Sequence, residues 1–457
     1  MAAGVVRFVK AVSNLVLHYA REQIDLGRMS TLDPSLRADV MSSLAASGPL
    51  DTASRVSLLM LRLGEALALV VFISFCGLWI RWQTESALPG VSADFISFWT
   101  AGQLVLDGRA ADAYREIPHH LKQIALYHDP VRGYLAFFYP PFFLLPCAAL
   151  ALLGFLPAVC VWIGTTCLGY AAAMRAILSR GLRQGQHVWV LFLGYPAVMV
   201  NAGFGQNGFL SAALFGGAAV WLERRPELAG VCLGCLAYKP QLGIIVPLGL
   251  AVARRWRCFA AACATVLALT VVVTLAFGAD VWPAFFAGMS VAKQKWMEAP
   301  DPSYLRFLIT VFGALRLHDA SLPFAYAAQA LVTVGAAFML VRALLLRPLD
   351  ARSGTAEIAA IAACVPFCSP FMLEYDLVIL AVPMAWLLGE ALRDGFRHGE
   401  AAALVGVYLS PVLFKITAFD NVMKLTVIGA AGLLFALVLR RMTEAPAPLP
   451  LKAAPSY

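Results

Sequence analysis

Apolar runs separated by short polar loops make up most of the chain. A helix needs about 20 mostly apolar residues to cross a bilayer, and only helices or closed barrels satisfy their backbone groups there. The pattern therefore predicts an all-α polytopic membrane protein with about 12 transmembrane helices. The predicted helices lie at 58–80, 157–178, 188–201, 208–222, 228–238, 241–253, 258–277, 322–346, 356–370, 376–393, 401–415 and 422–439.

Composition points the same way, because 61% of the residues are hydrophobic and 14% are charged. Soluble domains have roughly 45–50% apolar and about 25% charged residues. Arginines cluster in short loops, as at 254–257 and 440–441, so the net charge of +8 indicates a loop bias. We therefore expect membrane lipids as partners and no nucleic acid.

The basic loops predict an orientation. If each run crosses once and the N-terminus is cytoplasmic, all arginine-rich loops and the C-terminus fall on the cytoplasmic side. These loops are 175–183, 224–225, 254–257, 347–352, 393–397 and 440–441. The segments with unusual polar residues then open together on the outer face: 81–136, 201–207, 238–241, 278–321 and 369–376.

Two stretches do not fit a simple crossing. Residues 137–155 are apolar but contain the tandem Pro140 and Pro141, and a crossing here would turn the later arginines outward. We therefore expect an outer-leaflet or re-entrant element. The runs 228–238 and 241–253 are each too short to cross, and we expect a broken helix pair that meets at Lys239.

Residues 1–57 are expected to form a separate cytoplasmic part. An amphipathic helix over 5–19 would lie on the membrane surface, followed by a polar, Ser-rich linker at 30–57. No cleavable signal peptide is evident. The membrane domain is expected at 58–440, and a Pro-rich cytoplasmic tail at 441–457.

Asp94 is the candidate catalytic residue. It lies in the long first outer loop beside Phe95, Phe98 and Trp99, aromatic residues that suit a membrane interface. A carboxylate at this depth indicates a function, and it could take the proton of a sugar hydroxyl as a general base or bind substrate. Trp99 is a candidate substrate contact. The alternative for Asp94 is a helix N-cap or a solvated loop acid.

Lys239 is the candidate ligand for a phosphate. It is a cation at the break between two apolar half-spans, where a charge needs a partner. Lysine commonly binds phosphate as a point charge, so we expect Lys239 to hold the phosphate of a sugar donor. The alternative is an internal ion pair with Asp376 or Glu374.

Other polar residues of the outer loops are candidates for substrate binding. Amide side chains suit recognition of sugar hydroxyls, although 201–207 could be only a turn between helices. Helix capping is the alternative for the acid at 376, and solvation is the alternative for a loop histidine, which could also assist proton transfer. These candidates are Asn201, Gln206, Asn207, Gln241, Tyr375, Asp376 and His318.

No Walker loop, dinucleotide-binding glycine motif or HExxH sequence occurs, and we expect no cofactor and no metal ion. The predicted cytoplasmic loops are too short to form a nucleotide-sugar site. A sugar donor would therefore be lipid-linked and approach through the membrane. The rival class is a multispanning transporter or lipid flippase, which would use the same spans and buried charges.

Short motifs follow one another in a characteristic order within 58–440. They resemble glycosyltransferase family 87, which includes polyprenol-phosphate-mannose-dependent α-1,2-mannosyltransferases and belongs to the C-type, multispanning superfamily. The motifs are Asp94-Phe95 with Trp99, Tyr139-Pro140-Pro141-Phe142, Asn201 with Gly205-Gln206-Asn207, Ala237-Tyr238-Lys239-Pro240, and Ser369-Pro370 with Tyr375-Asp376.

The resemblance implies a C-type bundle with a long first extracytoplasmic loop, in a bacterial inner (plasma) membrane. It also implies an inverting transfer of a hexose, with mannose favoured, from a polyprenyl-phosphate sugar. The acceptor would be an envelope glycan or glycolipid. By this likeness Asp94 corresponds to the first-loop catalytic aspartate.

Overall fold

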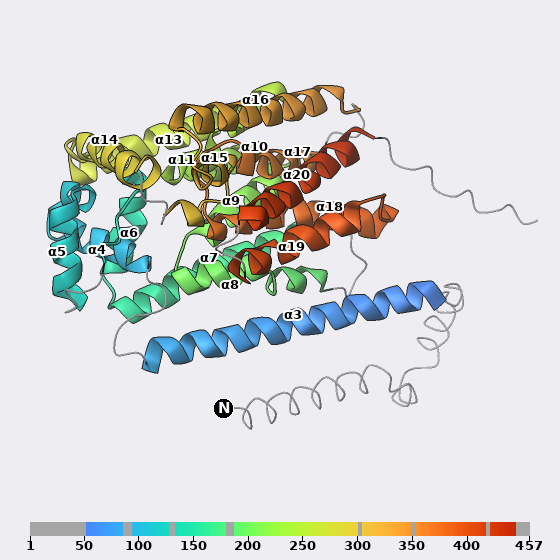
Figure 1. Ribbon diagram of the computed structural model, residues 1–457, viewed down its shortest axis with the longest axis horizontal. Helices are drawn as coiled ribbons and strands as arrows, with labels where there is room; N and C mark the ends of the chain where they lie inside the picture. Colours follow the sequence, from blue (N-terminus) through green and yellow to red (C-terminus); the bar gives the residue numbers. More distant parts are fainter. Residues whose placement is uncertain are drawn as a thin grey trace, which may run out of the picture. The chain divides into compact units, whose positions relative to one another are not determined.

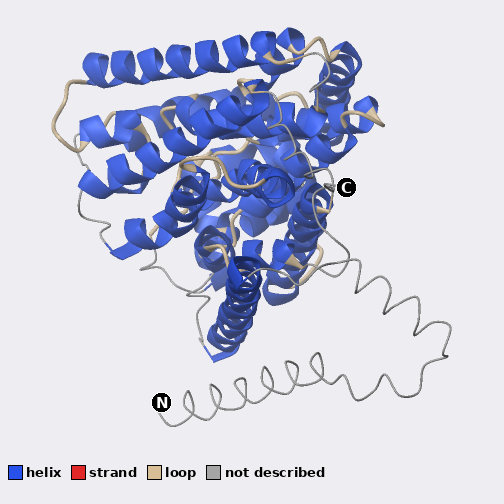
Figure 2. Ribbon diagram, turned by 90° about the vertical axis from the view of Figure 1, so that its right-hand side faces the viewer, coloured by secondary structure: helices blue, strands red, loops and turns tan. Residues whose placement is uncertain are grey.

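The computed structural model describes residues 52–85, 94–127, 133–179, 187–299, 304–348, 353–416 and 421–444. Throughout these residues the chain forms helices and loops and no strand (Figure 2), apart from one isolated bridge between Leu308 and Leu373. The prediction of an all-α protein is confirmed. The amphipathic helix expected at 5–19 lies outside the described residues.

Six helical segments of the described chain are long and apolar enough to cross a membrane. They coincide with six of the predicted spans, but the expected number of about 12 is not confirmed. They are α3 (Thr52–Glu85), α7 (Phe155–Leu178), α13 (Trp256–Phe277), α16 (Leu322–Leu346), the segment Glu374–Asp394 that ends in α18 (Ala381–Asp394), and α20 (Asn421–Thr443).

The chain divides between Cys76 and Gly77 into two compact units, so most of α3 belongs to the first and all other described helices belong to the second. The helix α3 begins at Thr52, within the expected linker, and α20 ends at Thr443, within the expected tail.

The remaining predicted spans are shorter helices. The run 188–201 divides into a 3₁₀ turn, Val188–Phe192, and α8 (Pro196–Phe204), because Pro196 cannot donate to the preceding turn. Three others are α9 (Gly208–Trp221), α17 (Gly354–Cys364) and α19 (Glu400–Ile416), and the runs 228–238 and 241–253 form a broken pair. At 1.5 Å per residue, α9 is about 21 Å long, less than the roughly 30 Å of a hydrocarbon core.

Short helices form the interior of the second unit, and longer ones surround them (Figure 1). Every residue of α17 is buried, and this helix packs against α9, α18 and α20. By contrast, α13 exposes most of its apolar side chains, as a lipid-facing helix would. Burial by the neighbouring helices thus explains how segments too short to cross alone are accommodated.

The broken helix pair that the sequence predicts is present. The helix α10 (Pro226–Cys235) leads through a 3₁₀ turn, Leu236–Tyr238, to α11 (Pro240–Gly243) and α12 (Val246–Val252). Glycine lets α10 approach α13 closely, since a Cβ at position 230 would lie 2.4 Å from the carbonyl oxygen of Cys258. The break therefore places Lys239 at a turn inside the protein.

Residues 137–155 contain only a 3₁₀ turn, Pro141–Phe143, and the eight-residue helix α6 (Leu144–Ala151). Such a helix is about 12 Å long, too short to cross a bilayer. It packs against α4 (Phe95–Leu106), where a Cβ at Gly102 would meet the carbonyl oxygen of Cys147 at 2.1 Å. This geometry agrees with the expected non-crossing element.

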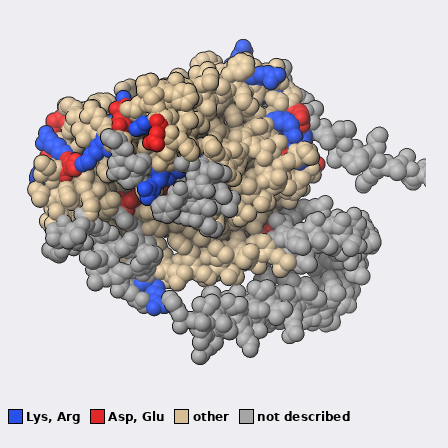
Figure 3. All heavy atoms as spheres, viewed as in Figure 1, with Lys and Arg blue, Asp and Glu red and all other residues tan. Residues whose placement is uncertain are grey.

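The first loop is itself helical. It contains α4, a 3₁₀ helix at Ala110–Tyr114 and α5 (Glu116–Tyr127), and it packs against α14 (Val281–Ala292) (Figure 1). Lysines, arginines and acids gather over this end of the second unit, next to a broad surface of other residues (Figure 3). That distribution matches a polar end beside an apolar, membrane-facing belt.

Candidate active site

The turn between α8 and α9 forms the centre of the site. Gly205 ends α8 with φ +70°, a left-handed conformation that glycine adopts without strain. The side-chain oxygen of Asn201 accepts a hydrogen bond of 2.6 Å from the backbone N–H of Gly208. A Cβ at Gly208 would lie 2.5 Å from the carbonyl oxygen of Tyr375, so the turn presses closely against the 374–380 segment.

Asp94 faces this turn from the N-terminus of α4. Its carboxylate caps no backbone N–H of α4; instead Oδ2 accepts a hydrogen bond of 2.7 Å from Nε2 of Gln206. The backbone N–H of Asp94 donates to the carbonyl of Phe204 at 3.2 Å. Two contacts across more than a hundred residues thus fix a half-buried acid, and they favour a function over helix capping.

Tyr139 completes a chain of hydrogen bonds that ends at Asp94. Its hydroxyl donates to Oε1 of Gln206 at 3.0 Å, while Nε2 of the same amide donates to Asp94. Burial, together with the carboxylates of Asp376 and Asp94, raises the pKa of Tyr139 well above its ordinary value. The hydroxyl therefore stays protonated and keeps the amide of Gln206 turned with its N–H groups toward the acid.

Lys239 forms the ion pair that the sequence left open as the alternative to phosphate binding. Its ammonium group contacts Asp376 and donates to Oδ1 of Asn207 at 2.9 Å, and both charged side chains are buried. The ring centre of Tyr375 lies 5.0 Å from the ammonium. Because the charge already has a partner, the reason for placing a phosphate at Lys239 is weakened.

Asp376 combines the two roles weighed for it. One carboxylate oxygen contacts Lys239, and the other accepts a hydrogen bond of 3.1 Å from the backbone N–H of Leu373 at the start of its helix. The hydroxyl of Tyr238 lies 2.6 Å from that of Ser211 and donates to the carbonyl of Asn207 at 3.2 Å. Lys239 thus binds the side chain of Asn207, and Tyr238 binds its backbone carbonyl.

Aromatic side chains border this network. Tyr304 lies 5.0 Å from Trp296 and 6.2 Å from Phe371, measured between ring centres. Tyr304 packs against the buried group that includes Tyr375, as does Phe204 of the 201–207 turn. Burial, followed by the negative charges of Asp94 and Asp376, raises the pKa of Tyr304. Sequence reasoning did not select Tyr139, Tyr304 or Trp296, although the density of aromatic residues in the outer segments was a signal.

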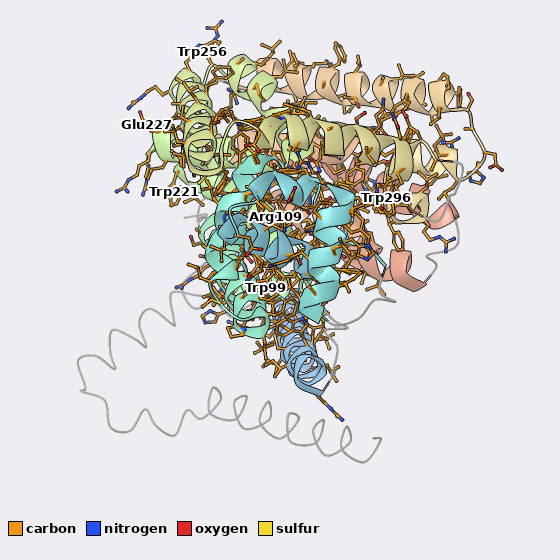
Figure 4. The ribbon with its side chains drawn as sticks, turned by 90° about the vertical axis from the view of Figure 1, so that its left-hand side faces the viewer. Trp99, Arg109, Trp221, Glu227, Trp256 and Trp296 are labelled. Carbon is orange, nitrogen blue, oxygen red and sulfur yellow. The ribbon has the colours of Figure 1, made fainter. Side chains whose placement is uncertain are left out.

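Three sequence candidates lie outside the network, and their substrate-binding roles stay predictions. Trp99 donates its indole N–H to the carbonyl of Leu153 at 3.0 Å and packs on Phe155 (Figure 4). Gln241 is partly exposed on α11, and His318 is exposed after the end of α15 (Val311–Arg316).

Segments that the sequence pattern assigns to the outer face are nevertheless in contact with one another. Asp94 reaches the 201–207 turn, Lys239 reaches Asp376, and the backbone N–H of Ile309 donates to the carbonyl of Met372 at 2.9 Å. Arginines of the predicted cytoplasmic loops form other groups, among them Arg255 with Glu357. In the described part of the chain no group of three His, Cys, Asp or Glu side chains could hold a metal ion.

These observations define a polytopic helical membrane protein with a half-buried carboxylate and a buried ion pair beside the 201–207 turn. Residues 137–370, just over half of the chain, match the model of glycosyltransferase family 87, and the chain belongs to this family. It is therefore a membrane glycosyltransferase. No curated protein and no solved structure matches it.

The matched range covers only part of the site. It includes the 201–207 turn, Lys239 and the aromatic residues Trp296 and Tyr304. Asp94 and Asp376 lie outside it, on the two sides of the match. Their placement in the site therefore rests on the contacts described above.

Proposed function

We propose that the protein transfers a hexose, with mannose favoured, from a polyprenyl-phosphate sugar to an envelope glycan or glycolipid. The reaction would occur on the extracytoplasmic face and invert the anomeric configuration. The observation that carries this proposal is the half-buried carboxylate of Asp94, held at 2.7 Å by Gln206 in a member of glycosyltransferase family 87.

In the proposed reaction Asp94 acts as the general base. It accepts the proton of the acceptor hydroxyl while that oxygen forms a bond to the anomeric carbon of the donor sugar. The bond between this carbon and the phosphate oxygen breaks on the opposite face, and polyprenyl phosphate leaves with the electron pair. A phosphate monoester is a stable anion, so the leaving group needs no strong general acid.

The groups around Asp94 would orient it. Gln206 donates to one carboxylate oxygen, and this amide is itself held by Tyr139, which supports an acid that is fixed before substrate arrives. The carboxylate of Asp94 is the proposed proton acceptor. Preorganisation of this kind avoids rearrangement at the moment of reaction.

We propose a positioning role for Lys239 in place of a direct contact with the donor phosphate. A phosphate beside Lys239 would also face the carboxylate of Asp376, which repels it. The ion pair instead supports Asn207, whose backbone adjoins Gln206. The substrate site would then be shaped by the two ends of the turn and by the segment packed against it. The residues concerned are Asn201, Asn207, Tyr375 and Asp376.

The proposed setting is a bacterial inner membrane with both termini in the cytoplasm, supported by the arginine-rich loops that the sequence pattern assigns to one side. The test is to incubate purified protein with a panel of radiolabelled polyprenyl-phosphate sugars and a membrane extract. Formation of a labelled glycan or glycolipid supports the proposal. Uptake of a solute or lipid by proteoliposomes, with no sugar transfer from any donor, would support the transporter class instead.

A further inference from the structure

The segment after α14 has an unusual backbone. Residues Lys293–Met297 form a π-helical turn, in which the backbone N–H of Glu298 donates to the carbonyl of Lys293, five residues earlier, at 3.0 Å. Such turns are rare, and they occur frequently at functional sites because they shift the direction of the side chains that follow. Here the turn carries Trp296.

Trp296 packs between two segments that lead to the 201–207 turn. On one side its ring lies 6.3 Å from Phe138, the neighbour of Tyr139, which is joined to Asp94 through Gln206. On the other side it lies 5.0 Å from Tyr304, which packs against the same buried group as Phe204 of the 201–207 turn.

A buried hydrophobic group connects these aromatic residues to the 201–207 turn. Phe204, Met297, Tyr304 and Phe371 pack against one buried group that includes Tyr375. The aromatic surface formed by Trp296, Tyr304 and Phe371 is therefore continuous with the turn that holds Asp94.

This aromatic surface lies among charges that face water. The side chains of Lys293 and Lys295 are 58% and 50% exposed, and they pair with Glu298 and Glu116. Trp296, labelled in Figure 4, is partly exposed in the turn that directly follows α14. A lipid-facing surface would disfavour these charges, so the aromatic surface suits a hydrophilic ligand more than a prenyl chain.

We propose that Trp296, Tyr304 and Phe371 bind a sugar ring of a hydrophilic glycan acceptor and thereby deliver its hydroxyl to Asp94. This inference rests on the proposed function and names the acceptor class for that site. Pyranose rings have an apolar face of C–H groups that packs on aromatic rings, while their hydroxyls suit a polar rim. The paired charges leave the rim nearly neutral, as an uncharged carbohydrate requires.

The test measures binding of manno-, gluco- and galacto-oligosaccharides of two to four units by calorimetry, without donor. At least one oligosaccharide should bind. Trp296→Ala should weaken that binding roughly tenfold, which corresponds to about 1.4 kcal/mol, and Trp296→Phe should weaken it less because an aromatic face remains. Trp256→Ala is the matched control, since that tryptophan is 58% exposed on α13, where its ring contacts Phe259.

The outcomes separate this inference from the proposed function. Oligosaccharide binding that depends on Trp296 supports the inference even if no polyprenyl-phosphate sugar is consumed, in which case the proposed function fails alone. Unchanged affinity in Trp296→Ala, or no binding of any oligosaccharide, would overturn the inference while sugar transfer could still occur. A raised KM for the donor with an unchanged KM for the acceptor would also overturn it, because the surface would then serve the donor.

Discussion

Removing one partner of the Lys239–Asp376 pair should destabilise the protein much more than removing both. The two side chains are 2% and 0% exposed. Apart from each other, Lys239 is hydrogen-bonded to the side-chain amide of Asn207 and Asp376 to the backbone N–H of Leu373. Lys239→Met or Asp376→Leu alone would leave a buried charge without its counter-ion, a loss of about 3–5 kcal/mol. The double variant removes both charges, and we expect it within about 1–2 kcal/mol of the wild type.

The assay is equilibrium unfolding of all four proteins in mixed detergent, analysed as a double-mutant cycle. The exposed pair Lys122–Asp107, with side chains 24% and 39% exposed, is the matched control and should show a coupling of less than about 1 kcal/mol. Additive losses at Lys239 and Asp376 would refute the reasoning. Binding of polyprenyl phosphate to the double variant tests whether Lys239 contacts the donor phosphate directly. A loss of affinity of more than about tenfold would support that direct contact.

Three further predictions follow from single contacts. Gln206→Leu removes the hydrogen bond to Asp94 and should lower kcat roughly 10- to 100-fold in the transfer assay with the fold retained, whereas an unchanged rate contradicts the orienting role. Gly208→Ala should reduce the yield of folded protein, because the added Cβ would lie 2.5 Å from the carbonyl oxygen of Tyr375. Gly203→Ala is the control and should fold normally, since no atom lies within 4 Å of its added Cβ. Equal yields of the two variants would refute this prediction. Burial lowers the pKa of His119 to about 4. The unfolded chain takes up this proton near pH 6.5, so stability should fall by up to ~3 kcal/mol on acidification from pH 6.5 to 4, and His119→Gln should flatten the slope of unfolding midpoint against pH.

The helical class and the positions of the long spans could be predicted because lipid imposes length and apolarity on each crossing helix. The broken pair at Lys239 was also visible, since Pro240 interrupts two runs that are too short. The expected number of about 12 crossing helices is not confirmed, since six segments of the described chain are long and apolar enough to cross. Segments such as α9 and α17 look like spans in an apolar sequence, and only their burial by neighbours shows how they are accommodated.

The candidate site could be predicted in part. Four polar residues of the predicted outer segments stood out, and the structure joins them in two pairs. These pairs are Asp94 with Gln206, 112 residues apart, and Lys239 with Asp376, 137 residues apart. The partner of Lys239 could not be decided from spacing alone. Aromatic residues such as Trp296 were missed because, in a sequence this apolar, they resemble ordinary interface residues.

The turnover of Asp94→Asn tests the central proposal most directly. Asparagine keeps the shape of the side chain but cannot accept the proton, so transfer from the polyprenyl-phosphate sugar should fall at least about a hundredfold with an unchanged unfolding midpoint. Asp107→Asn is the control at the other end of α4, where the acid pairs with Lys122, and it should keep wild-type activity. Transfer by folded Asp94→Asn at a rate near that of the wild type would contradict the assignment of Asp94 as the general base.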